Sequence, residues 1–189
     1  IDTEGNFSDG IVAQSLAGGG GNGGLSIVGA ASIGDNVSVG VSLGGNGGIG
    51  AKSGAVEVTS QGSIHTNGNN SSAVYAQSIG GGGGKGGLAV SASLSTSKTV
   101  NSNVAIGGKG VSGANADSVT VTTCGLANNV QCNLNNTQLL INSIVNINTT
   151  GILSYGIDAE SIGGGGGSGA AAIAANASLQ GNASGFRIG

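Results

Sequence analysis

The chain has no proline, methionine or tryptophan among its 189 residues, and its only aromatic residues are two tyrosines and two phenylalanines. Five Lys and Arg residues stand against eight Asp and Glu, so both phosphate-neutralising clusters and base-stacking platforms are missing, which argues against a nucleic-acid partner. No apolar run approaches the roughly 20 residues of a membrane-spanning helix, so we expect no membrane span here.

The missing methionine also predicts a fragment of a longer protein. The sequence begins at Ile1 inside a repeat, because Ile1–Gly5 matches Ile147–Gly151. Signal peptides and anchors would lie outside such a fragment, so their absence says nothing about the whole protein.

Cysteine is scarce as well. Cys124 and Cys132 lie eight residues apart, and the chain has one histidine, His65, so the ligands of a typical metal site are missing. The close pair in a polar segment predicts a small disulfide formed in an oxidising compartment, with two free thiols as the alternative. We predict no cofactor and no catalytic, cofactor-binding or metal-binding residue.

Glycine, in contrast, is abundant, with 42 residues, and the chain repeats itself. A short apolar phrase runs into a block of glycines three times, at Gly10–Gly21, Ala73–Gly84 and Gly156–Gly167. The offsets are 63 and then 83 residues. They define units of about 6–68, 69–151 and 152–189 within a single solenoid, with a loop inserted at about 124–144. We find no three-residue period in the glycine pattern, which would exclude collagen.

Between the glycines, segments such as Val37–Leu43, Leu88–Leu94 and Ala170–Leu179 alternate apolar and small residues, as strands do, and helix patterns are absent. A sandwich has no reason to repeat over such distances. The sequence therefore predicts an all-β fold, a parallel β-helix or β-solenoid, with right-handed winding and coils of roughly 21 residues, three to a unit. In such a solenoid, Val, Ile, Leu and Ala would point inward, and Ser, Thr and Asn outward.

The glycine blocks could be tight corners, close backbone contacts or disordered loops. Because they recur after the same strand, we predict an ordered contact surface in which absent Cβ atoms let backbones approach closely. Its residues are Gly18, Gly19, Gly20, Gly21, Gly80, Gly81, Gly82, Gly83, Gly84, Gly163, Gly164, Gly165, Gly166 and Gly167.

Polar residues stand at one place in all three repeats. Gln14, Gln77 and Glu160 precede the glycine blocks, and we expect them to lie in equivalent places and to bond turn backbone groups. Asp158 and Glu160 share one strand face and could form an acid/base couple. Tyr75 stands at the position equivalent to Asp158, which suits an exposed position better than a catalytic one.

The phrase Ala76–Gly87 (AQSIGGGGGKGG) resembles repeats in the passenger regions of large bacterial autotransporters, which are exported through an outer-membrane barrel and displayed as long β-helices. The shorter phrase Asn103–Gly107 is similar to the heads of trimeric autotransporter adhesins. The resemblance implies a structural or adhesive fibre protein, not an enzyme. It would be displayed at the bacterial cell surface or secreted, and anchored through a region outside this sequence. Its partners would be host or matrix surfaces, or its own copies in a homo-oligomeric fibre. A β-helical polysaccharide-active enzyme is the alternative.

Overall fold

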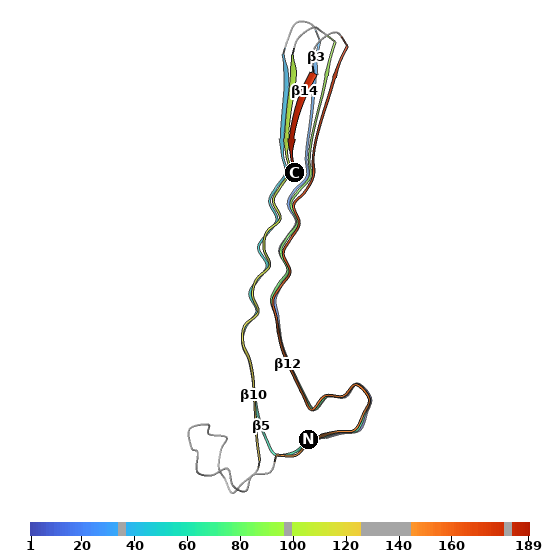
Figure 1. The fold of residues 1–189 in the computed structure, drawn as a ribbon, viewed down its shortest axis with the longest axis vertical. Helices are drawn as coiled ribbons and strands as arrows, with labels where there is room; N and C mark the ends of the chain where they lie inside the picture. The colour runs from blue at the N-terminus through green and yellow to red at the C-terminus, as the bar shows by residue number, and fades with distance from the viewer. Residues whose placement is uncertain (34–36, 97–99, 126–144, 180–182) are drawn as a thin grey trace. The chain divides into compact units, whose positions relative to one another are not determined.

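The computed structural model describes residues 1–33, 37–96, 100–125, 145–179 and 183–189, and this part of the chain is all-β (Figure 1). The prediction of an all-β fold with parallel strands is confirmed, and the arrangement is consistent with a β-solenoid. No helix long and apolar enough to cross a membrane occurs in the described residues. The strands are β1 Asp2–Thr3, β2 Ile11–Leu16, β3 Ser26–Ser32, β4 Ser38–Leu43, β5 Val56–Gln61, β6 Ile64–Thr66, β7 Val74–Ile79, β8 Ala89–Ser95, β9 Asn101–Ile106, β10 Val119–Cys124, β11 Ile147–Thr149, β12 Ile157–Ile162, β13 Ala172–Ser178 and β14 Ala183–Ile188.

Each strand pairs with its counterpart in the next repeat. Ile11 pairs with Val74 and Val74 with Ile157, so the register reproduces the two sequence offsets. One pass of the chain therefore takes a whole repeat of 63 residues and contains several strands, as between Asp2 and His65. The expected coil of roughly 21 residues is wrong, because strands next to each other in sequence join different sheets and do not pair with one another.

The described chain divides into two compact units. The first, which we call the three-sheet unit, comprises Ile1–Leu16, Ser53–Ile79 and Ala116–Ile162. Its sheets are β1–β6–β11, β5–β10 and β2–β7–β12. Val56, Val58, Ile64 and Val74 point into an apolar core, as the alternating pattern predicts for this unit.

A stacked turn joins β6 to β7 and recurs in each pass. Phe7, Asn70 and Leu153 occupy the same place and all adopt left-handed backbone conformations, with φ of 57°, 52° and 56°. The column is held by side-chain bonds: the Ser71 hydroxyl accepts a bond from the Ser8 amide at 3.0 Å and donates to the Gly5 carbonyl at 3.0 Å. Repeated side-chain bonds of this kind fix the register of the stack.

The second unit, the two-sheet unit, comprises Ala17–Lys52, Gly80–Asn115 and Gly163–Gly189. Its sheets are β3–β8–β13 and β4–β9–β14. The buried side chains between the sheets are small or polar; they are Ser38, Ser42, Ala89, Ser91, Ser93, Ser95, Asn101, Asn103 and Ala105. The Asn103 side-chain amide crosses from β9 and donates to the Ala175 carbonyl of β13 at 2.9 Å.

In β4 of this unit the expected orientation of side chains is reversed. Val39, Val41 and Leu43 point outward from β4, while serines and a glycine point inward. The cause lies just beside the strands, where the Gly45 amide donates to the Gly24 carbonyl at 3.0 Å. These two segments adjoin β3 and β4, so they hold the two sheets close together. Only small side chains then fit between the sheets. A Cβ on Gly40, for example, would lie 2.5 Å from the Asn103 Oδ1 atom and 2.7 Å from the Ser91 Oγ atom.

Candidate functional site: a glycine bundle and a polar ladder

Five glycine-rich segments of the two-sheet unit bond to one another through their backbones, and we call them the glycine bundle. They are neither helix nor strand, and Figure 1 draws them as undulating traces. The segments are 17–25, 44–52, 80–88, 107–115 and 163–171.

The central segment 80–88 bonds to all four others, and its bonds recur every third residue. Gly81, Gly84 and Gly87 donate to carbonyls of segment 44–52 at 2.8, 2.9 and 2.7 Å. The carbonyls of the same three glycines accept from amides of segment 107–115 at 2.9, 3.2 and 2.8 Å. Both of these neighbours run antiparallel to the central segment.

The two parallel neighbours use the remaining positions. Gly83 donates to the Gly165 carbonyl at 2.7 Å, and the Gly82 carbonyl accepts from the Gly20 amide at 2.7 Å. A step of three residues is the repeat of the polyproline II conformation, whose backbone makes no internal hydrogen bonds and leaves every group free for neighbours. The bundle satisfies its backbone between segments instead of within them.

Close packing explains why glycine is needed at most positions of the central segment. A Cβ on Gly83 would overlap the Val111 carbonyl oxygen and lie 2.6 Å from the Gly167 nitrogen. A Cβ on Gly82 would meet nothing nearer than the Gly165 oxygen at 3.8 Å. Neighbouring glycines in one block therefore differ sharply in the room they have.

The fourteen glycines that the sequence grouped as one contact surface divide into two sets. Those whose Cβ would collide with backbone are Gly20, Gly80, Gly81, Gly83, Gly84, Gly164 and Gly167. Those with room for a side chain are Gly18, Gly19, Gly21, Gly82, Gly163, Gly165 and Gly166. Segments 17–25 and 163–171 are crowded at one position in three, whereas segment 44–52 and the central segment are crowded at two in three.

This packing is visible in the sequence as a local three-residue period of glycine, although no such period runs through the whole chain. Segment 44–52 reads GGNGGIGAK, and segment 107–115 reads GGKGVSGAN, so glycine keeps a local three-residue period. Exposed side chains such as Ile49, Lys85 and Lys109 fill the third positions. The statement that glycine has no three-residue period is therefore wrong for these segments.

Gln14, Gln77 and Glu160 form a polar ladder in the three-sheet unit. The register pairs Gln14 with Gln77 and Gln77 with Glu160. Gln14 Nε2 donates to Gln77 Oε1 at 3.2 Å, and Gln77 Nε2 donates to Glu160 Oε2 at 2.7 Å. The three side chains thus bond to each other, where we had expected bonds to turn backbone.

Serines take over that backbone role. Ser15 Oγ accepts from the Gly54 amide at 2.8 Å, and Ser78 Oγ donates to the Gly54 carbonyl at 3.0 Å. Each serine directly follows a ladder glutamine in sequence, so the side chains that bond this backbone lie one residue after the predicted ones.

Asp158 lies beside the ladder and pairs in register with Tyr75. Burial, and then the negative charge of Glu160, raise the pKa of Asp158 above its ordinary value. His65 pairs in register with Asp2 and with Asn148. No group of three or more His, Cys, Asp and Glu residues that could hold a metal ion occurs in the described part of the chain.

Cys124 ends β10, whereas Cys132 and most of the inserted loop at 124–144 lie outside the described residues. The disulfide between them stays a prediction.

No protein-family model, curated protein sequence or solved structure matches this chain.

Proposed function

We propose that this chain is a structural or adhesive element of a fibre at the bacterial cell surface or outside the cell, built as a right-handed β-solenoid. It would be the passenger region of an autotransporter, anchored through a region outside this sequence. Its partners are host or matrix surfaces, or further copies of itself. It needs no cofactor and performs no catalysis.

The observation that carries this proposal is the glycine bundle. Its five segments are joined by backbone hydrogen bonds between 2.7 and 3.2 Å, and the crowded positions hold no side chain at all. Backbone amides already bonded to carbonyls offer neither a nucleophile nor a proton donor to a substrate. Such a bundle serves to hold parts of a chain at fixed spacing.

The polysaccharide-active alternative would depend on Asp158 and Glu160. A raised pKa on one carboxyl of a pair suits a general acid, but catalysis at a sugar also needs groups that hold the substrate. In the described residues, Tyr75 is the aromatic partner in register, and the Glu160 carboxylate already accepts the Gln77 amide. This alternative therefore has less support.

Adhesion of coated microspheres tests the proposal. Beads carrying the folded chain should adhere to matrix-coated surfaces or to each other, and beads carrying the Gly83→Ala chain should adhere less, because that Cβ overlaps the Val111 carbonyl. Gly82→Ala is the matched control, since a Cβ has room there. Release of reducing sugar from a polysaccharide panel, lost in Asp158→Asn and Glu160→Gln variants, would overturn the proposal in favour of the enzyme.

A further inference from the structure

The two-sheet unit carries its largest apolar side chains on the outside. Val39 and Leu43 are each 61% exposed, whereas Ser91 and Asn103 are buried between the sheets. The apolar core cluster consists of residues of the three-sheet unit only, among the described residues. The aliphatic surface of the two-sheet unit is still in contact with water, so burying it against a partner would be favourable.

One outer face has a raised row of large side chains, and we call it the ridge face. It belongs to sheet β4–β9–β14. The register aligns Val41 with Val104 and Phe186 across the three strands, and Phe186 is 58% exposed. The next row out, Leu43–Ile106–Ile188, is also apolar.

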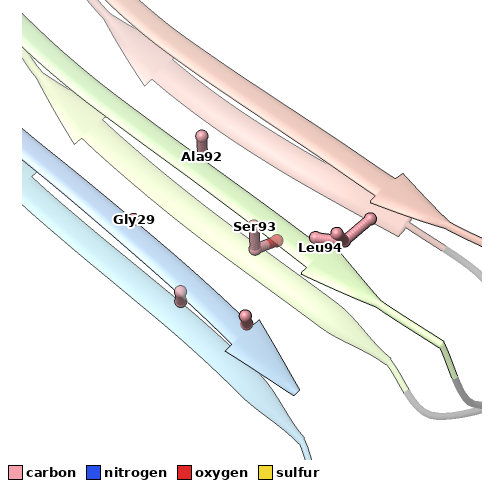
Figure 2. Close-up of a pocket in the computed structure, with 6 residues that line it drawn as sticks. Gly29, Ala92, Ser93 and Leu94 are labelled. Carbon is pink, nitrogen blue, oxygen red and sulfur yellow. The ribbon is translucent and has the colours of Figure 1, made fainter. Parts of the chain in front are cut away.

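The opposite outer face is hollowed, and we call it the hollow face. It belongs to sheet β3–β8–β13, where the register aligns the small residues Gly29, Ala92 and Ala175. A hollow of about 330 Å³ lies there, lined by Gly29, Ala30, Ala31, Ala92, Ser93 and Leu94 (Figure 2). The larger Ile27, 68% exposed, and Leu94, 51% exposed, stand in the rows on either side.

We propose that the ridge face of one copy of this chain packs on the hollow face of a second copy. A row of large side chains fits a row of small ones, and sheets commonly pack face to face. Because the two faces differ, the contact is head to tail, so each added copy presents a fresh face and a fibre can grow.

The size of the faces fits a second copy. The exposed large apolar side chains are Val39, Val41, Leu43, Phe186 and Ile188 on the ridge face, and Ile27, Leu94 and Ile173 on the hollow face. Apolar patches of roughly 300–600 Å² are the largest that a typical monomer leaves bare, and they often bind a partner. Pairing two such patches would bury on the order of 600–1,200 Å², the size of a weak or transient interface.

The chemistry of the faces also selects this partner. None of the described outward positions of β3, β4, β8, β9, β13 and β14 holds a charged residue. A charged protein surface would lose its hydration against such a face without gaining a partner. A helix that lies on a membrane surface is rich in Lys and Arg on its polar face. Among the described residues of these six strands only Arg187 is charged, and it stands in register with the inward Ala105. An equally uncharged face of another copy has neither problem.

This inference deepens the proposed function, on which it depends for its biological setting. Purified chain tests it apart from adhesion, by sedimentation velocity of the whole chain over a range of concentrations. Val41→Lys should disable the ridge face and Ala92→Lys the hollow face, each lowering the association constant at least about 100-fold, because a lysine would be buried unpaired. Thr59→Lys, an exposed β5 residue of the three-sheet unit, is the charge-matched control and should associate like the parent chain.

Mixing separates head-to-tail from symmetric contact. Each lysine variant alone should be monomeric, and the two together should form one-to-one dimers through the faces that remain intact. If Ala92→Lys alone associates like the parent chain, or if the mixture stays monomeric, the proposal is overturned. Binding of the parent chain to phosphatidylcholine vesicles with no self-association would overturn it in favour of a lipid partner. Bead adhesion by chains that do not self-associate would overturn this inference and leave the proposed function standing.

Discussion

Lys85 shows at the scale of one residue how the glycine bundle selects its side chains. It lies three residues after Gly82, at a position of segment 80–88 that faces solvent, whereas its neighbours Gly84 and Gly86 would each put a Cβ onto backbone. A lysine beside a run of glycines resembles part of a phosphate-binding loop, but here it marks the open position of a three-residue repeat.

We therefore expect opposite results from two adjacent glycines. Gly83→Ala should lower the free energy of unfolding by about 1–3 kcal/mol or more, because the Cβ would overlap the Val111 carbonyl. Gly82→Ala should be neutral or raise it by about 0.4–1 kcal/mol, because alanine restricts the unfolded chain and meets no atom within 3.4 Å. Urea denaturation of both variants measures the two values, and equal effects would contradict the packing described here.

Asp158 gives a pH prediction. Its pKa is raised in the folded chain, first by burial and then by Glu160, so the folded state binds its proton more tightly than the unfolded state does. Stability from this group is then greatest in acid and falls as the pH rises through the folded pKa. Asp158→Asn should give a small rise in melting temperature at neutral pH and none in acid, where the parent carboxyl is protonated. A rise of the same size at both pH values would show that the charge is not the cause.

At the scale of the element, the sequence predicted which strands are equivalent, but not which strands pair or which way their side chains face. The 63-residue offset was enough to align Gln14 with Gln77, because ladders require like residues at like places. The coil length failed because evenly spaced strands say nothing about which of them pair. The orientation failed in β4 because a two-residue alternation defines two faces, and only the spacing of the sheets decides which face holds Ser42 and which holds Val41.

The hydrogen bonds of segment 80–88 predict a pattern in amide exchange. The amides of Gly81, Gly83, Gly84, Gly86 and Gly87 all donate to neighbouring segments. Among the described backbone bonds none comes from the amides of Gly82 or Lys85. Exchange followed by NMR should thus be slow at two positions and fast at the third, repeated along the segment. Uniformly fast exchange would contradict an ordered bundle.

At the scale of the whole molecule, hydrophobic stabilisation is divided between an interior and an exterior. The three-sheet unit buries Val56, Val58 and Ile64 within itself, while the two-sheet unit exposes residues such as Val41 and Ile173. Assembly would bury this second set, which makes solution conditions that act on apolar surface a means of controlling association.

We expect sodium sulfate to strengthen self-association and cooling to weaken it, since excluded salts favour apolar burial and apolar hydration becomes less costly in the cold. Sodium chloride at moderate concentration should change it little, because screening acts on charges and the two faces carry none at their described outward positions. Light scattering across these conditions measures the response. Association that dissolves in sodium chloride would point to charged contacts elsewhere on the chain.

The bonding of the bundle through main chain alone also restricts how its length can change. One extra residue in segment 80–88 would turn all that follows by a third of a rotation and carry a side chain such as Lys85 into the place of a crowded glycine. Three extra residues restore the phase, but only if the antiparallel and parallel neighbours lengthen as well. Growth or shortening would thus come in triplets, about 9 Å at a time, in all five segments together. An insertion or deletion in one segment would therefore have to be matched by equal changes in the other four, which are encoded at distant points in the gene.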